Sequence, residues 1–314
     1  MDLVKTDKNP TPRGAKAGFF EAGDGVFLRY ATWPARHGQS RGTVCLFTGR
    51  GEFIEKYFEV VKELLDRGFS VAAMDWRGQG RSPRVLENPR KGHIESFDQY
   101  YDDLVTFIET VVLPECAPPF FVLAHSMGAS IVLKSLYHRE WFNRAVLVSP
   151  MIGFPTRWVL NKTLTTLVDA AVSLGFKGSF VPGGKSRSVE EREFANNRLT
   201  SDLDRFERTR AILTSDPTLG VGSPTFGWVS AALDHMQDLQ QENFGQTVLV
   251  PTLMVAGGHE QVVSYLAIET LCRKMPNGAL VTIEGARHEI MMERDIYRQQ
   301  LWGAFDAFVP GGGL

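Results

Sequence analysis

A serine, a glutamate and a histidine lie in three short segments that could together carry out nucleophilic chemistry. Ser126 stands in LAHSMGAS, between an apolar run that predicts a strand and one that predicts a helix. Glu260 lies in GGHEQVV and His288 in EGARHE. A serine hydroxyl becomes an effective nucleophile when a histidine takes its proton, and a carboxylate must orient that histidine. These residue types, in this chain order, indicate acyl transfer.

Other roles for these residues and their neighbours stay open. Ser126 alone would also suit the N-cap of the helix that follows it. We interpret His125 as a packing residue, because neighbours on a sharp turn point apart. His259 competes with His288 as the base, but it shares the loop of Glu260 and would point elsewhere.

The elements that must position these residues alternate along the chain. Amphipathic helical patterns, the last over 295–308, separate apolar strand-like runs. One of these helices is expected from about Asp98 to Val112, with Ser96 and Gln99 as a possible capping box. The strand-like runs are 43–49, 70–76, 120–123, 144–150, 250–258 and 278–285. Such alternation predicts an α/β fold with a mostly parallel, doubly wound sheet. Ligands bind at the carboxyl ends of the strands in such a sheet, and Ser126, Glu260 and His288 all fall there.

The alternation stops after Pro150. The segment 151–235 has helical patterns and Gly, Pro and Ser residues, but no clear strand. We therefore predict a core in two parts, 1–150 and 236–314, with 151–235 inserted between them as a helical cap (lid). Apolar residues recur at helical spacing in WVLNKTLTTLVDAAVSLGF: Leu160, Leu164, Leu167, Val168, Ala171 and Leu174. This helix either packs on the core or turns apolar surface toward a lipid chain or a bilayer.

Composition excludes several classes of protein. The 314 residues are 43% hydrophobic, enough for a large core, and the net charge of -2 comes without the basic block that nucleic-acid binding requires. The three cysteines lie far apart, which favours a reducing compartment over a disulfide framework. No apolar run is long enough for a signal peptide or a membrane span. We therefore expect a cytoplasmic protein.

Motifs for metals and nucleotides are incomplete. HEQVV and HEIMM lack the second histidine of a zinc-binding HExxH helix. GQGRSP and GRGEFI lack the third glycine of a dinucleotide fingerprint. We expect neither a metal nor a cofactor.

The motifs and their order resemble the α/β-hydrolases, and among them the monoacylglycerol lipase and bacterial lysophospholipase branch. The resemblance covers roughly residues 16–310 and rests on GRGEFIEKY, DWRGQGRS, AHSMGA, NRLTSDLDRF, GSPTFGWVSAA and EGARHE. Two positions depart from the pattern of that family. Ala124 replaces the first glycine of GxSxG, and Glu260 stands where an aspartate is usual.

The same resemblance implies an oxyanion hole made by the backbone N–H groups of Arg50 and Met127. Gly49 and Gly51 would give the Arg50 turn room to bend toward the substrate. The guanidinium of Arg50 has two possible roles. It either pairs with a nearby carboxylate such as Glu52 or Glu55, or it meets the phosphate of a lysophospholipid.

The resemblance implies a cofactor-independent serine hydrolase that cleaves carboxylic esters through an acyl-enzyme. Its expected substrate is a small lipid or ester, most simply a lysophospholipid or a monoacylglycerol. Peripheral contact with the inner membrane face through the cap is a further expectation. Three alternatives stay open on the same fold: a peptidase, a carbon–carbon bond hydrolase and a catalytically inactive binding module. Acyl length, head group and oligomeric state do not follow from the sequence.

Overall fold

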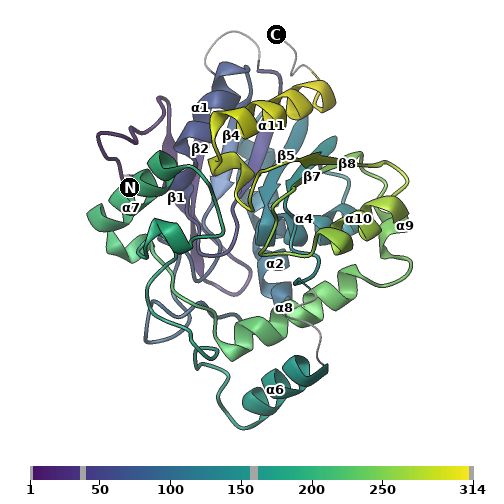
Figure 1. Ribbon diagram of the computed structural model, residues 1–314. Helices are drawn as coiled ribbons and strands as arrows, with labels where there is room; N and C mark the ends of the chain where they lie inside the picture. The colour runs from purple at the N-terminus through teal and green to yellow at the C-terminus, as the bar shows by residue number, and fades with distance from the viewer. Residues whose placement is uncertain (1–2, 36–39, 156–161, 311–314) are drawn as a thin grey trace.

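An eight-stranded sheet forms the centre of the computed structural model, which describes residues 3–35, 40–155 and 162–310 (Figure 1). The strand order is β1-β2-β4-β3-β5-β6-β7-β8. The strands are β1 (Lys16–Glu21), β2 (Phe27–Trp33), β3 (Thr43–Phe47), β4 (Ser70–Met74), β5 (Phe120–His125), β6 (Arg144–Val148), β7 (Thr252–Gly257) and β8 (Gly278–Ile283). β1, β2 and β4 pair antiparallel, and every pair from β4 to β8 is parallel. The predicted mostly parallel sheet is confirmed.

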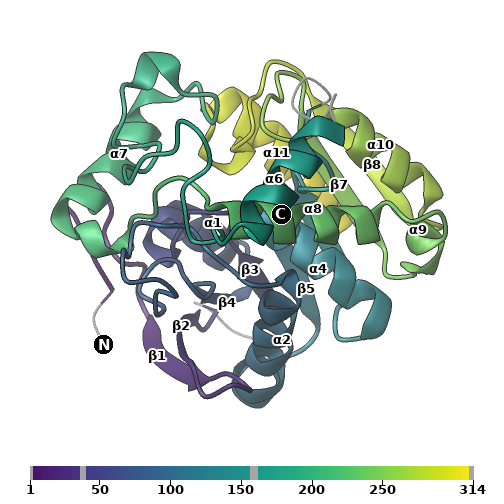
Figure 2. The ribbon, with the colours of Figure 1, turned by 90° about the horizontal axis from the view of Figure 1, so that it is seen from below.

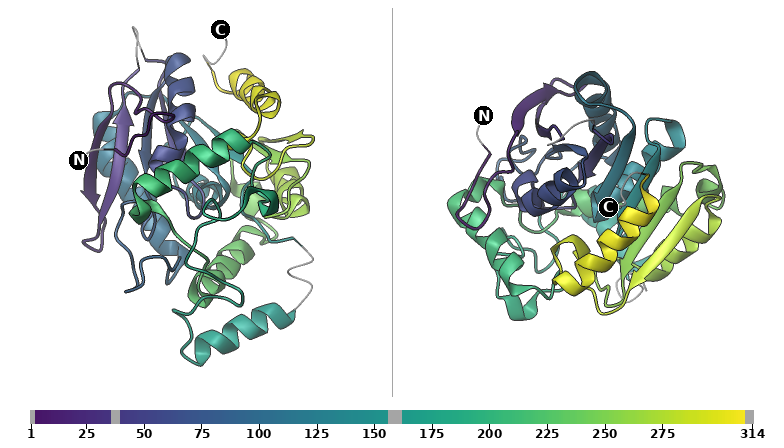
Figure 3. Two further views of the ribbon diagram at one scale, coloured as in Figure 1. Left: turned by 60° about the vertical axis from the view of Figure 1, so that its left-hand side comes forward. Right: turned by 90° about the horizontal axis from the view of Figure 1, so that it is seen from above.

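Helices cover both faces of this sheet (Figures 1 and 3). One face carries α1 (Phe58–Asp66) and α11 (Asp295–Phe308), and the other carries α2 (Phe97–Phe107), α4 (Ser126–His138) and α10 (Tyr265–Lys274). Alternate side chains of β3 show why: Val44 and Leu46 pack with the first set, and Cys45 and Phe47 pack with the second. Because both faces are buried, the central strands read as continuous apolar runs.

Shorter helices join or extend these elements. They are η1 (Ile54–Tyr57), η2 (Ile108–Val112), α3 (Leu113–Glu115), η3 (Phe194–Asn196), η4 (Pro217–Leu219), α9 (Phe244–Thr247) and η5 (Ile290–Met292). The start of α2 differs from the expected capping box. Ser96 caps the helix by accepting a hydrogen bond from the N–H of Asp98 rather than of Gln99, and the Gln99 side chain accepts from the N–H of Glu95 rather than of Ser96. The helix predicted to reach residue 112 continues from α2 as the π-helical turn η2.

The described residues between β6 and β7 form helices and no strand. The main helices are α6 (Lys162–Ser173), α7 (Leu203–Ser215) and α8 (Phe226–Leu239). α8 packs on α4 and α2, and α6 packs on α8 at the edge of the molecule (Figures 1 and 3). α7 lies apart from both and contacts η1, as Figure 2 shows.

The apolar face predicted for the cap helix is only partly covered. Val168 is buried, whereas the side chains of Leu167 and Leu174 are 60% and 74% exposed. Leu160 and the side chain of Leu164 lie outside the described residues. None of the helices that the structure describes is long and apolar enough to cross a membrane.

Candidate active site

Ser126 lies at a sharp turn between β5 and α4. Its φ is 48°, in the left-handed region that non-glycine residues rarely adopt. A Cβ at Gly128 would lie 2.4 Å from the carbonyl oxygen of Thr48, so only glycine lets the start of α4 approach the end of β3 this closely. The turn presents the hydroxyl of Ser126 at the carboxyl end of the sheet. Strained turns of this kind occur where a nucleophile must stand clear of the backbone.

The structure brings Ser126, His288 and Glu260 together. His288 Nε2 lies 3.0 Å from Ser126 Oγ, and His288 Nδ1 lies 2.8 Å from Glu260 Oε2. The other carboxylate oxygen of Glu260 accepts hydrogen bonds from the N–H groups of Val262 and Val263, at 2.7 and 3.2 Å. Glu260 therefore reaches His288 from the position where an aspartate is usual. The two backbone N–H groups hold Oε1, and this leaves Oε2 directed at the imidazole.

Electrostatics keeps Glu260 ionised. Burial alone would raise the pKa of this carboxyl, but the charge and hydrogen bond of His288 and the two backbone donors lower it to about 2. An ionised Glu260 can hold a proton on Nδ1 of His288, which leaves Nε2 as the acceptor that faces Ser126. The arrangement can therefore activate the hydroxyl and stabilise the imidazolium that forms.

Arg50 and Met127, the two predicted oxyanion donors, follow the ends of the neighbouring strands β3 and β5. Met127 is the second residue of α4, where helix N–H groups have no acceptor within the helix. Two hydrogen bonds join the Gln79 side chain to the turn of Arg50, one from Gly51 N–H at 2.7 Å and one to the Gly49 oxygen at 3.0 Å. The sequence did not reveal this role of Gln79, although DWRGQGRS stood out as a strand end.

The expected pairing of the Arg50 side chain with Glu52 or Glu55 is wrong. Glu55 forms an ion pair with Arg29, and the hydrogen bonds and ion pair of Glu52 involve other groups. Within the described chain no carboxylate lies at ion-pair distance from Arg50. Its Nη2 donates to the carbonyl of Gly222 at 2.6 Å, and its guanidinium lies 5.1 Å from the Trp228 ring centre. Burial lowers the pKa of Arg50 to about 10.

Of the two other histidines considered, one is exposed and the other contacts the site. His259 is exposed, and the structure shows His288, not His259, at hydrogen-bond distance from Ser126. His125 does more than pack: its Nδ1 lies 3.0 Å from Glu52 Oε2 and its Nε2 lies 3.3 Å from the carbonyl oxygen of His288. No local motif signals this contact, because it joins residues that are far apart in the chain.

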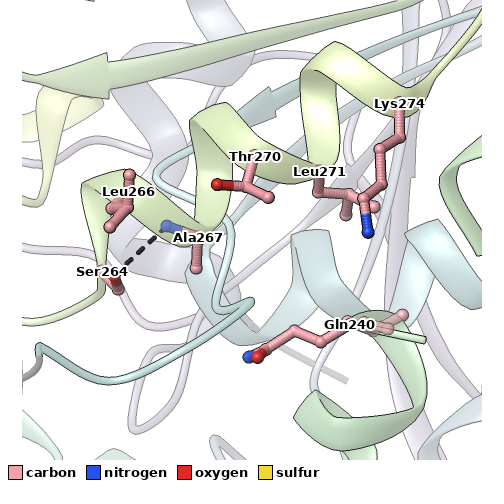
Figure 4. Close-up of a pocket in the computed structure, with 8 residues that line it drawn as sticks. Gln240, Ser264, Leu266, Ala267, Thr270, Leu271 and Lys274 are labelled. Atoms are coloured by element: carbon pink, nitrogen blue, oxygen red, sulfur yellow. Dashed lines mark hydrogen bonds between the residues drawn. The ribbon is translucent and has the colours of Figure 1, made fainter. Parts of the chain in front are cut away.

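A cavity of about 250 Å³ is formed by residues other than those of the predicted site (Figure 4). Its lining residues belong mainly to α10 and the end of α8: Leu239, Gln240, Ser264, Leu266, Ala267, Thr270, Leu271 and Lys274. Gln240 donates to the carbonyl of Ile152 at 2.6 Å and so ties this wall to the loop after β6. None of the predicted site residues lines the cavity.

The doubly wound sheet with a serine at the turn after its central strand defines an α/β-hydrolase. The model of the family described as "Serine aminopeptidase, S33" matches residues 38–295, and the chain belongs to this family. It is therefore a serine hydrolase of the α/β-hydrolase class.

Curated relatives and solved structures agree with this family. The chain is 32% identical to "Lysophospholipase L2" of Escherichia coli over 89% of its own length and 83% of the relative. It is 30% identical to "Monoacylglycerol lipase" of Mycolicibacterium smegmatis, over 86% of this chain and 88% of the relative. The crystal structure of a soluble variant of monoglyceride lipase from Saccharomyces cerevisiae has the same fold. Its TM-score is 0.76 at 21% identity, over 99% of this chain and 98% of the other.

Proposed function

We propose that this protein hydrolyses carboxylic esters through an acyl-enzyme, with Ser126, His288 and Glu260 as its triad. The observation that carries the proposal is the relay from Ser126 Oγ to His288 Nε2 and from His288 Nδ1 to Glu260. His288 takes the hydroxyl proton as Oγ attacks the ester carbonyl, and it returns that proton to the leaving alcohol. Water then attacks the acyl-enzyme with the same histidine as base, which releases the acid and restores Ser126.

The N–H groups of Arg50 and Met127 would donate to the oxyanion of each tetrahedral intermediate. One such donor is worth about 3 kcal/mol of barrier in comparable enzymes. The bonds from Gln79 to Gly49 and Gly51 support this role, because they fix the Arg50 turn before substrate arrives.

A lysophospholipid is the substrate class that we favour, with a monoacylglycerol as the neighbouring possibility. Relatives with both names match most of the chain. The guanidinium of Arg50 adds an argument for phosphate: it adjoins the proposed oxyanion hole, it has no carboxylate partner among the described residues, and its buried Nε has no hydrogen-bond partner. A phosphate would supply the missing negative charge.

The inserted segment 151–235 would act as a cap over the carboxyl ends of the strands, between the core parts 1–150 and 236–314. The exposed Leu167 and Leu174 of α6, with Phe176 just beyond it, offer an apolar surface for a lipid chain or a bilayer. Cys45, Cys116 and Cys272 are all free, which supports the expected cytoplasmic location, at or near the inner membrane face.

Two experiments test this function. A fluorophosphonate probe should label the wild type at Ser126, whereas an inactive binding module would not react. A panel of lysophospholipids, monoacylglycerols, short p-nitrophenyl esters and aminoacyl amides then separates the reactions. Ester hydrolysis without amide hydrolysis supports the proposal, and preference for an aminoacyl amide would instead assign a peptidase, the activity in the family's description.

Arg50→Ala tests the head group. The backbone N–H survives this change, so the informative quantity is the ratio of kcat/KM for a lysophospholipid to that for the matched monoacylglycerol. A hydrogen bond to a charged group is worth about 1.5–3 kcal/mol, so this ratio should fall roughly ten- to a hundredfold. Arg50→Lys, which keeps the charge without the planar fork, is the matched control and should lose less. Equal losses on both substrates would assign the side chain to support of the turn.

A further inference from the structure

A buried lysine joins three segments that meet at the active site. Lys56 is 2% exposed, and its ammonium lies 2.7 Å from Glu289 Oε1 and 3.1 Å from Glu190 Oε1. Its third partner is Glu52, whose Oε1 lies 3.0 Å away. The two groups form an ion pair, but their geometry is not that of a hydrogen bond. Removing any of these ions from water is costly unless its partners are held in place.

Each carboxylate belongs to a different part of the proposed machinery. Glu52 closes the turn that carries Arg50, Glu289 directly follows His288, and Glu190 lies in the predicted cap. The backbone N–H of Glu289 also donates to the carbonyl of Leu199, another residue of the cap segment, at 2.8 Å. One cation therefore joins the oxyanion turn, the loop of the base and the cap.

Glu52 extends this cluster to the reacting groups. Its Oε2 accepts hydrogen bonds from the backbone N–H of Gly49, from the Tyr57 hydroxyl and from His125 Nδ1. The imidazole rings of His125 and His288 lie 4.8 Å apart between centroids. Burial alone would lower the pKa of His125, but the charge of Glu52 raises it, so the protonated ring can donate to both Glu52 and the His288 carbonyl.

Three carboxyl groups surround Lys56, and His125 is the second basic group of the cluster. Glu52, Glu190 and Glu289 face the ammonium of Lys56 and the ring of His125, with the Tyr57 hydroxyl as the remaining titratable group. The pKa of Glu289 is raised to about 7, mainly by burial; the charges of Glu52 and Glu190 act in the same direction, and those of Lys56 and His125 oppose them. The ammonium therefore decides how much negative charge His288 experiences from its neighbouring residue.

We propose that Lys56 is a positioning residue for hydrolysis. It holds the turn of Arg50, the loop of His288 and the predicted cap in fixed positions relative to one another, and its charge offsets that of the carboxylates near His288. The inference rests on the proposed function. It goes beyond the triad because it assigns a catalytic effect to a side chain that touches neither substrate nor the reacting atoms.

Lys56→Met tests the proposal on a short neutral ester. The kcat should fall roughly ten- to a hundredfold with KM little changed, because distorted donors and base affect the transition state more than ground-state binding. Unbalanced carboxylates favour the imidazolium of His288, so the acid limb of the pH–kcat/KM profile should move up by about half a pH unit or more. Lys56→Arg keeps the charge and should restore much of both properties.

Glu190→Gln supplies a change of opposite sign. It removes one negative charge, so the acid limb should move to lower pH, again by about half a unit. A purely structural role predicts no such pair of opposite shifts. The matched control is Arg67→Met, which breaks a partly exposed ion pair with Asp306 at 2.7 Å, between α1 and α11. It should lower stability and leave the profile in place.

The outcomes separate this inference from the proposed function. If fluorophosphonate labels the wild type and both Lys56→Met and Glu190→Gln keep the wild-type kcat and acid limb, the positioning role is wrong and the triad stands. If Lys56→Met does not fold, Glu190→Gln decides alone: a shift to lower pH supports the role, and an unchanged limb overturns it. A wild type that neither reacts with the probe nor cleaves esters overturns both proposals.

Discussion

Ser126 is the side chain on which turnover should depend most, because its Oγ forms the acyl bond in the proposed mechanism. Ser126→Ala leaves the donors and His288 in place but removes the nucleophile. We expect kcat for a p-nitrophenyl ester to fall on the order of 10⁴-fold or more, with an unchanged circular dichroism spectrum.

The matched control is Ser135→Ala, a buried serine further along α4 that donates to the Val132 carbonyl at 2.7 Å. It should keep near wild-type activity. Activity of Ser126→Ala within tenfold of the wild type would contradict the assignment of the nucleophile.

Glu260 can be tested by charge and by length separately. Glu260→Gln keeps the length but loses the charge that stabilises the imidazolium, so kcat should fall by about 10³-fold or more. Glu260→Asp keeps the charge and should retain a larger share of the activity. A near wild-type rate for the glutamine variant would place the acid elsewhere, and Asp234 and Asp238 of α8 would be examined next.

Single residues differ in how far the sequence could assign them. Ser126, Glu260 and His288 could be found because each follows an apolar strand-like run, and strand ends of a parallel sheet meet at one edge. Lys56 and His125 could not be assigned, because burial decides their pairing and most of their partners, such as Glu190 and Glu289 of Lys56, are distant in the chain. The same limit explains the wrong pairing of Arg50: the preference of Glu55 for Arg29 is a property of packing.

At the scale of elements, the approach of α4 to β3 sets the position of Ser126, the proposed nucleophile. Gly128→Ala would place a Cβ 2.4 Å from the Thr48 oxygen and 2.9 Å from that of Phe47, both backbone atoms that cannot turn aside. Overpacking of this kind costs about 1–3 kcal/mol of unfolding free energy, and it should also displace the Met127 donor and lower kcat.

Gly303→Ala in α11 is the matched control for this substitution. No heavy atom lies within 4 Å of a Cβ placed at Gly303. The residue is exposed and lies in the middle of the helix, away from both ends. The change should raise the unfolding free energy by about 0.5–1 kcal/mol without affecting turnover. Urea unfolding of both variants measures the contrast, and equal effects would contradict the close approach at Gly128.

Elements were predictable where their periodicity is strong. The bounds of α11, 295–308, follow from its pattern, and all strands that were expected from apolar runs are present. The π-helical turn η2 was missed because its residues are as apolar and helix-compatible as those of α2. The sequence also did not show that the Gln99 side chain accepts from the N–H of Glu95 instead of that of Ser96. These two residues are adjacent, and only the backbone geometry determines which N–H points at Gln99.

At the scale of the whole molecule, acid stability should depend on one buried histidine. Burial, with Lys134 nearby, lowers the pKa of His235 to about 4, and its ring stacks on Phe97 at 4.7 Å between centroids. In the unfolded chain His235 takes up a proton at about pH 6.5, whereas in the folded protein it stays neutral until about pH 4. The unfolding free energy therefore contains the full contribution of neutral His235 above pH 6.5 and loses it as the pH falls toward 4. The loss amounts to about 3 kcal/mol.

His235→Phe keeps a stacked ring and has no proton to bind. Its unfolding free energy, measured by urea at pH 8, 6, 5 and 4, should fall less steeply than that of the wild type over the acid range. The comparison at pH 8, where both rings are neutral, is the control for packing. Parallel curves for the two proteins would show that His235 is accessible to protons in the folded state.

The segment predicted as a cap leaves the sheet after β6 and returns at β7, and these two strands are parallel neighbours. An insertion or deletion between them therefore changes no strand register. It also spares the loop that carries His288 as long as the contacts of Glu190 with Lys56 and of Leu199 with Glu289 are kept. Within the segment, α8 packs into the core through Trp228 and Met236, whereas α6 contacts mainly α8. Natural variation in length should thus be concentrated in the parts of 151–225 that make neither of these contacts, where a change can alter the substrate range without altering the proposed catalytic residues.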